Sequence, residues 1–323
     1  MSLEADAIVD RRRMRRKLTF WRVVAVVFAI GAIVALSTRL FLASGERGGA
    51  YVARVKIQGV IRNDDERTEA LDRLAKSNAK AVIVRIDSPG GTVAGSEQLY
   101  DSLRKVAAAK PTVVVVDGLA ASGGYIAAMA SDQIFALDTS LVGSIGVLFQ
   151  LPNVSKLLNT VGVNVETVRS APLKAAPNGL EPTSPEARAA LESLVQDSFD
   201  WFKTLVQTRR SLDPAQLTQA SDGRVFTGRQ AIALKLIDRI GNEQTAREWL
   251  AVEKKVPAST RIRDWKLKAR LGDMSFLHLA TVGALDALGF GSAARWVEGH
   301  GVVQAIDRAN LDGLLALWHP SVN

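Results

Sequence analysis

The chain has 323 residues, of which 47% are hydrophobic and 23% charged, a balance typical of a folded protein and not of a disordered one. It contains no cysteine, which excludes disulfides, thiolate nucleophiles and cysteine-bound metals. The formal net charge is +8, and part of this excess lies in one basic block, residues 11–17. A long apolar segment follows this block at once, which argues against a nucleic-acid partner and for a membrane.

Residues 18–42 form that apolar segment, and its two charges, Arg22 and Arg39, lie near its ends, where arginine side chains can reach lipid headgroups. A spanning helix needs about 20 apolar residues. The preceding basic block predicts a cytoplasmic N-terminus. We therefore expect an uncleaved transmembrane signal anchor. A cleaved signal peptide is the alternative, because Ala43-Ser44-Gly45 offers small residues near a possible cut.

Beyond a short linker, residues 43–50, strand-like and helix-like segments alternate along the chain. This alternation predicts an α/β fold with a largely parallel sheet. The strand-like segments are 51–61, 81–86, 112–116, 133–137, 146–149 and 165–168. The helix-like segments are 66–77, 93–109, 122–131, 154–160, 185–210, 213–220, 228–236 and 242–253.

The most informative segment is Ala121-Ser122-Gly123-Gly124-Tyr125, which follows the apolar run Val113–Val116. The run predicts a short buried strand, and the small apolar residues after the segment predict a packed helix. A serine on such a turn lies where backbone amides and the helix dipole favour developing negative charge, which suits an acyl-transfer nucleophile. An N-cap serine followed by close-packing glycines would explain the same residues.

A nucleophilic serine needs a general base. The three histidines, His278, His300 and His319, all lie in the C-terminal quarter, so a serine–histidine–acid triad is not favoured, and no histidine pair has the spacing of a metal site. Lysine can serve as the base where an apolar setting destabilises its ammonium. Lys174 lies in a short apolar loop and is a candidate, although the sequence alone favours an ordinary solvated loop lysine.

Two glycine-containing turns complete the candidate residues. Asp87-Ser88-Pro89-Gly90-Gly91 follows a predicted strand, and consecutive glycines let backbone amides converge on an oxyanion. Gly143-Ser144-Ile145-Gly146-Val147 carries Ser144, whose hydroxyl could orient a neutral lysine amine. Each segment taken alone also fits an ordinary turn.

The C-terminal region is the hardest to interpret. Residues 275–288 are apolar and amphipathic, and 311–318 are apolar with a tryptophan. Packing against the core, against a neighbouring subunit or on the membrane surface would each suit these segments.

Together, the turns at 87–91, 120–125 and 143–147, followed by Lys174, resemble the signal peptide peptidase A family, the membrane-bound serine–lysine peptidases of bacteria. Further support comes from Gly223-Arg224-Val225-Phe226-Thr227-Gly228, Ala231 and Leu236-Ile237-Asp238. The resemblance covers roughly residues 51–241, and the order and spacing of the motifs make it specific.

The resemblance implies roles for individual residues. Ser122 is implied as the nucleophile, Lys174 as its general base and Ser144 as the hydroxyl that positions the lysine. Gly90 and Gly91, with Gly123, are implied as the oxyanion-hole neighbourhood. No cofactor and no metal are expected. The family core is similar to the Clp protease and crotonase fold.

The resemblance also implies an organisation and a location. The expected parts are a basic cytoplasmic N-terminus (1–17), the transmembrane signal anchor (18–42), the linker (43–50), a serine–lysine peptidase domain (51–256) and a C-terminal region without an assigned role (257–323). The single set of motifs resembles the short forms, which assemble into homo-oligomeric rings. The expected site is the bacterial inner membrane, with the catalytic domain on the extracytoplasmic side.

The implied substrates are apolar extended peptides, such as signal peptides left in the membrane after cleavage. Two other functions remain open from the sequence. A crotonase-type acyl-CoA enzyme would share the fold and the glycine turn, and a membrane-tethered scaffold would need no catalysis.

Overall fold

The computed structural model describes residues 49–267 and 314–318 and, before them, residues 21–22, 24–25, 28–29 and 31–33. The chain divides into two compact units, Met1–Ala50 and Tyr51–Asn323. The described residues of the first unit before residue 49 are helical. Most of the predicted anchor, like the apolar segment 275–288, lies outside the described residues. Within the described part of the chain, no helix combines the length and apolar character that crossing a membrane requires.

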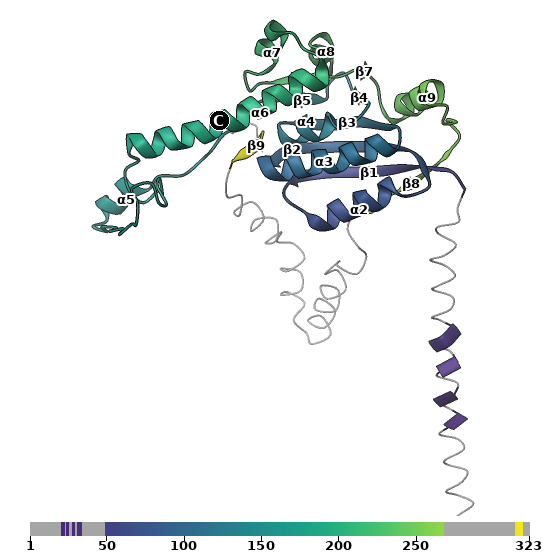
Figure 1. Cartoon of the computed structure of the whole chain (residues 1–323), viewed down its shortest axis with the longest axis horizontal. Coiled ribbons are helices and arrows are strands. Elements are labelled where there is room, and N and C mark those ends of the chain that lie inside the picture. The colour runs from purple at the N-terminus through teal and green to yellow at the C-terminus, as the bar shows by residue number, and fades with distance from the viewer. Residues whose placement is uncertain are drawn as a thin grey trace, which may run out of the picture. The chain divides into compact units, whose positions relative to one another are not determined.

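The second unit is built on one mixed, mostly parallel sheet in the order β6-β5-β3-β2-β1-β8, with β4 beside β3, β7 beside β4 and β9 beside β2 (Figure 1). Among the strand pairs that the structure describes, only β5–β6 and β2–β9 are antiparallel. The sequence-based expectation of an α/β fold with a largely parallel sheet is therefore confirmed. The strands are β1 (Tyr51–Ile61), β2 (Ala79–Thr92), β3 (Thr112–Ala121), β4 (Gln133–Ala136), β5 (Leu141–Gly143), β6 (Val225–Thr227), β7 (Arg239–Ile240), β8 (Arg261–Asp264) and β9 (Leu315–Leu317).

The central strands are buried on both faces, which is why their sequences are continuous apolar runs rather than alternating ones. Val114 and Val116 of β3 pack in the larger core with helices α2 (Asp65–Ala75), α3 (Val93–Ala109) and α4 (Gly123–Ala128). Val113 and Val115 point to the other face, which α9 (Glu243–Glu253) covers. The sheet is thereby held rigid between two layers, and its strand ends are fixed.

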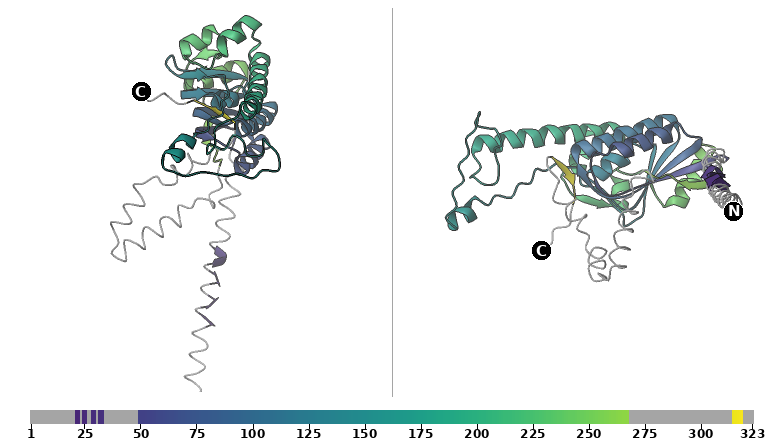
Figure 2. Two further views of the ribbon diagram at one scale, coloured as in Figure 1. Left: turned by 90° about the vertical axis from the view of Figure 1, so that its left-hand side faces the viewer. Right: turned by 90° about the horizontal axis from the view of Figure 1, so that it is seen from below.

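A long segment leaves this body after β5. Residues 146–184, here called the arm, contain the short helix α5 (Ser155–Thr160) and lead into the long helix α6 (Pro185–Arg210). Figures 1 and 2 show α5 and the start of α6 extending beyond the sheet. The C-terminal half of α6 returns to the body, where Phe202 and Val206 are fully buried and Arg210 pairs with Asp238 at 2.8 Å. Helices α7 (Pro214–Ala220) and α8 (Gly228–Ala233) follow.

Many large apolar side chains of the arm are exposed in the single chain. They are Leu148, Leu151, Val154, Leu157, Val161, Val163, Val165, Val168, Leu173 and Leu180. Apolar exposure concentrated on one segment in this way is typical of an interaction surface.

Two predicted strands are wrong, and both lie on the arm. Residues 165–168 form no strand, and Val168 is 94% exposed. In 146–149, Leu148 makes only an isolated bridge to Leu315. An alternating pattern becomes a strand only beside a neighbour that completes its hydrogen bonds, and the described residues of this chain offer the arm almost none. The helix predicted to start at Ser122 starts at Gly123, because the backbone of Ser122 is not helical.

Candidate active site

Ser122 lies at the sharp turn between β3 and α4, where its backbone adopts φ 53° and ψ −116°. A positive φ is unusual for a residue with a side chain and persists only where the surroundings enforce it. Here the Ser122 amide donates to the Gly143 carbonyl at 2.7 Å, and the residue is only 1% exposed. Its hydroxyl lies 3.5 Å from the Gly146 carbonyl oxygen. A serine held on a strained strand-to-helix turn is typical of hydrolase nucleophiles.

Three glycines bring backbone against backbone beside this serine. Gly90 has φ +100°, and a Cβ placed on it would lie 2.7 Å from the Gly123 amide nitrogen. A Cβ on Gly123 would lie 3.1 Å from the Gly91 amide nitrogen. Side chains at these positions would therefore separate two segments that touch through their main chains. The close approach explains why glycine occupies all three positions.

The amides in this cluster differ in what they already bind. The Gly90 amide donates to the Ser88 hydroxyl at 3.1 Å, and that hydroxyl donates to the Gly59 carbonyl at 2.6 Å. Gly90 therefore shapes the turn rather than offering a donor. The Gly123 amide is the first of α4, where no intrahelical carbonyl is within reach. The Gly123 amide is thus suited to an incoming oxygen, and the Gly91 amide, in the part of β2 that pairs with β9, lies close beside it.

Ser144 lies directly beside Ser122. The parallel register pairs Ala121 with Gly143, so the two serines occupy equivalent positions just beyond the ends of β3 and β5. Ser144 is also held at positive φ, 49°, and its amide donates to the Arg224 carbonyl at 2.8 Å. It is 8% exposed. The strand ends thereby bring together five of the six sequence-predicted site residues.

Lys174 is the sixth, and the structure places it elsewhere. It lies on the arm, in a turn where its amide donates to the Ala171 carbonyl at 3.0 Å, and its side chain is exposed. The single chain therefore does not bring Lys174 to Ser122, whose hydroxyl faces Gly146.

The site contains one element that the sequence did not reveal as part of it. Strand β9 pairs with β2 at the glycine turn, in the register Gly90 with Leu317 and Gly91 with Ala316. From its sequence, the segment 311–318 could have packed on the core, on a subunit or on the membrane. Its described part, 314–318, lies against the core. The alternation of leucine and alanine in Leu315–Leu317 was the available signal.

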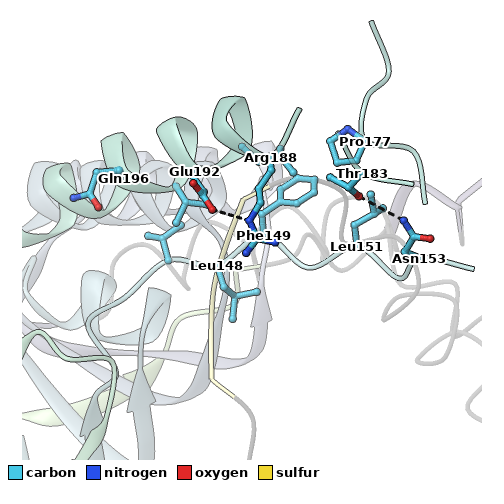
Figure 3. Close-up of a pocket in the computed structure, with 12 residues that line it drawn as sticks. Leu148, Phe149, Leu151, Asn153, Pro177, Thr183, Arg188, Glu192 and Gln196 are labelled. Carbon is cyan, nitrogen blue, oxygen red and sulfur yellow. Dashed lines mark hydrogen bonds and ion pairs between the residues drawn. The ribbon is translucent and has the colours of Figure 1, made fainter. Parts of the chain in front are cut away.

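A pocket of about 710 Å³ opens between the start of the arm and α6. Leu148, Phe149 and Leu151 line one side, and Arg188 and Glu192, paired at 2.9 Å, lie on the other (Figure 3). Leu148 connects the two features, because it lines the pocket and also forms the bridge to Leu315.

Comparison with known proteins decides the family. The model of Peptidase family S49 matches residues 104–257, and the Clp protease model matches residues 62–142. A putative protease of Synechocystis is 34% identical over 257 residues, covering 76% of this chain and 91% of the relative. The chain belongs to peptidase family S49. A putative protease of Methanocaldococcus jannaschii is 31% identical over 69% of this chain and 77% of its own length.

The resemblance to the signal peptide peptidase A family is thereby confirmed. A putative signal peptide peptidase SppA of Enterococcus faecium is 33% identical over 184 residues, which are 57% of this chain and 54% of that protein. The protein is a serine protease of the S49 family with a Clp protease-like α/β fold. Neither the acyl-CoA enzyme nor the non-catalytic scaffold accounts for these matches.

Proposed function

We propose that this chain is a membrane-anchored serine endopeptidase in which Ser122 is the nucleophile and Lys174 of a neighbouring copy is the general base. The observation that carries the proposal is the strained, buried turn at Ser122, next to the close approach of Gly91 and Gly123, in a member of a serine protease family. An ordinary N-cap serine has extended backbone geometry and would need no positive φ.

The position of the arm supports a base supplied by another copy. Lys174 is exposed on a segment whose apolar side chains lack partners in the single chain, whereas Ser122 is buried in the body. Docking the arm of one chain onto the next would cover these side chains and carry Lys174 to a neighbouring serine. Such a contact joins two different surfaces, and repeating it generates a ring where the rotation between copies closes.

The chemistry follows from these positions. Neutral Lys174 takes the proton of Ser122, whose oxygen attacks the peptide carbonyl carbon, and Ser144 holds the amine in place. The amides of Gly91 and Gly123 stabilise the oxyanion, and one such donor contributes about 3 kcal/mol to the transition state. The amine leaves with the proton, and water activated by the same lysine hydrolyses the acyl-enzyme.

The substrate class and location are part of the proposal. The Enterococcus relative is named a signal peptide peptidase, and the segment 18–42 is apolar enough in sequence to anchor the chain. We infer a single-pass protein of the bacterial inner membrane with residues 1–17 in the cytoplasm and the domain 51–256 outside it. Its substrates are apolar peptides, such as signal peptides released into the membrane.

The test compares peptide cleavage by the assembled wild type with that of Ser122→Ala and Lys174→Ala. Lys156→Ala is the matched control, since Lys156 is an exposed lysine on the same arm. We expect both site variants to lose cleavage while the control keeps it. A fluorophosphonate probe should label the wild type and not Ser122→Ala. Cleavage by the wild type should rise with pH as the lysine loses its proton, so a flat profile from neutral to alkaline pH would contradict the assignment of the base.

A further inference from the structure

The segment that carries Lys174 is closed at its base by an ion pair. Residues 170–180, here called the lysine loop, contain no charged residue other than Lys174. Arg169 precedes the loop and Glu181 follows it, and the Arg169 Nη2 donates to the Glu181 Oε2 at 2.6 Å. Neither residue lies in a helix or a strand. Side chains, and not a regular element, therefore fasten the two ends of the lysine loop to each other.

Glu181 also joins the lysine loop to other parts of the arm. Thr167 hydrogen-bonds its carboxylate as well. The Glu181 amide donates to the side-chain oxygen of Asn178 at 3.1 Å, and the Glu181 carbonyl accepts from the side-chain amide of Asn153 at 2.9 Å. The same Asn153 amide lies 3.4 Å from the Thr183 hydroxyl (Figure 3). Glu181 is thus the residue at which the end of the loop and the segment before α5 meet.

The backbone of the lysine loop is held as well as its ends. The Val154 amide donates to the Gly179 carbonyl at 2.8 Å. Gly179 has φ +74°, and a Cβ placed on it would lie 2.4 Å from the Pro152 carbonyl oxygen, so this close approach requires glycine. Within the loop, the Lys174 amide donates to the Ala171 carbonyl at 3.0 Å. The loop is therefore tied at its base and through its backbone, while the Lys174 side chain is left exposed.

The ion pair has an energetic cost as well as a gain. The Nε of Arg169 is buried and finds no acceptor among the residues that the structure describes. A buried N–H group without an acceptor is unfavourable, and two packed apolar side chains would close the loop without that cost. What the ion pair adds is a charge-assisted hydrogen bond of fixed length and direction. Such a bond suits a part of the molecule whose geometry has to be exact.

We propose that Glu181, held by Arg169, is a positioning residue for the general base. The pair fixes the base of the lysine loop and thereby determines where the Lys174 amine lies when the arm docks on a neighbouring copy. This inference rests on the proposed function. A general base must lie within about 3 Å of the proton that it takes, and a displacement of about 1 Å can lower the rate about a hundredfold. Glu181 and Arg169 touch neither serine nor substrate in this proposal and act through Lys174.

The first experiment measures kcat and KM for cleavage of an apolar peptide by assembled Glu181→Gln and Arg169→Gln. We expect kcat to fall about tenfold or more in both variants, because the amine is displaced from the serine proton. KM should change by less than about twofold, because the lysine does not hold the substrate. Glu166→Gln is the matched control, since Glu166 is an exposed glutamate on the same arm, and it should keep both constants. Mass spectrometry of the intact assembly verifies that all variants form the same particle.

The second experiment determines which chain must carry the ion pair. In mixed assemblies of Ser122→Ala with Lys174→Ala, the working sites receive their lysine only from the Ser122→Ala chains. Glu181→Gln added to the Ser122→Ala chains should lower cleavage by the mixture by the same factor as in the first experiment. Glu181→Gln added to the Lys174→Ala chains should leave cleavage unchanged, because those arms supply no base. A role in folding or docking of the arm would instead lower cleavage in both mixtures.

The outcomes separate this inference from the function on which it rests. If Lys174→Ala abolishes cleavage while Glu181→Gln and Arg169→Gln cleave like the wild type, the inference is wrong and the proposed function stands. Equal losses in the two mixtures, or a rise in KM at constant kcat, would likewise overturn the inference alone. If Lys174→Ala still cleaves, or if the mixture of Ser122→Ala with Lys174→Ala has no activity, the proposed function fails and the inference fails with it.

Discussion

Restoring activity by mixing two inactive variants would test the shared active site most directly. Ser122→Ala removes the nucleophile from a buried turn of the body, and Lys174→Ala removes the amine from an exposed turn of the arm. Neither variant carries a complete pair. If serine and lysine come from different chains, co-assembly of the two variants creates some sites that have both.

The expected recovery follows from the geometry. In an equal, random mixture, a site works only where a chain with intact Ser122 receives an arm with intact Lys174, so about a quarter of the sites regain function. If both groups came from one chain, no chain in the mixture would be complete and recovery would be absent. Ser122→Ala mixed with Lys156→Ala sets the scale, because only the serine is diluted and about half of the sites should work.

The assay is co-expression of each pair, purification of the assembled protein and measurement of cleavage of an apolar peptide per mole of chain. Mass spectrometry of the intact assembly verifies that both variants are present in one particle. Mixed particles that contain both variants and show no activity above either variant alone would refute the shared site. Recovery to the level of the Lys156→Ala mixture would contradict the role of Lys174, because the number of active sites would then not depend on how many chains carry this lysine.

Two further predictions concern the supports of the site. Tyr125→Phe should lower the free energy of unfolding by about 1–2 kcal/mol in a denaturant titration. The buried Tyr125 hydroxyl donates to the Leu236 carbonyl at 2.7 Å, and its loss leaves that carbonyl unpaired. Because burial raises the pKa of this tyrosine, the loss of stability should not vary from neutral to mildly alkaline pH. On the arm, hydrogen bonds from Thr167 and Arg169 hold the pKa of Glu181 below its ordinary value. The ionised Glu181 therefore stabilises the fold above the ordinary carboxyl pKa, and this stabilisation is lost as the pH falls through the lowered pKa. The difference in Tm between the wild type and Glu181→Gln should disappear on acidification, and a difference that persists would assign the effect to packing.

Much of the fold could be predicted from the sequence because its core elements carry their own signals. The helix 93–109 has the bounds predicted from the helical spacing of Leu99, Leu103 and Val106. The helix 185–210 has the bounds predicted from its capping residue Ser184. The valine run in β3 identified a doubly buried strand. Strands such as β6 and β7 were missed because they have only three and two residues, too few to show a period.

The site was predictable only in part, for a physical reason. Glycines and serines at strand ends have local signatures, and the strained backbone of Ser122 is consistent with the glycine-rich turn that follows it. The location of Lys174 relative to that turn depends on where an arm with few internal contacts docks, and no local pattern encodes a surface on another chain. Likewise, an apolar segment such as 311–318 predicts burial, but its sequence does not identify the strand with which it pairs.

Supplying the base from another chain has a consequence for how the amine could become neutral. On the isolated arm the Lys174 side chain is exposed, and water stabilises its ammonium. Docking beside the buried Ser122 would remove that water, and desolvation destabilises the charged form. In this proposal, assembly both brings the amine to the hydroxyl and creates the environment in which it can accept a proton. A single chain would then hold an intact nucleophile without a competent base, which suits a protease that must not act before it is assembled.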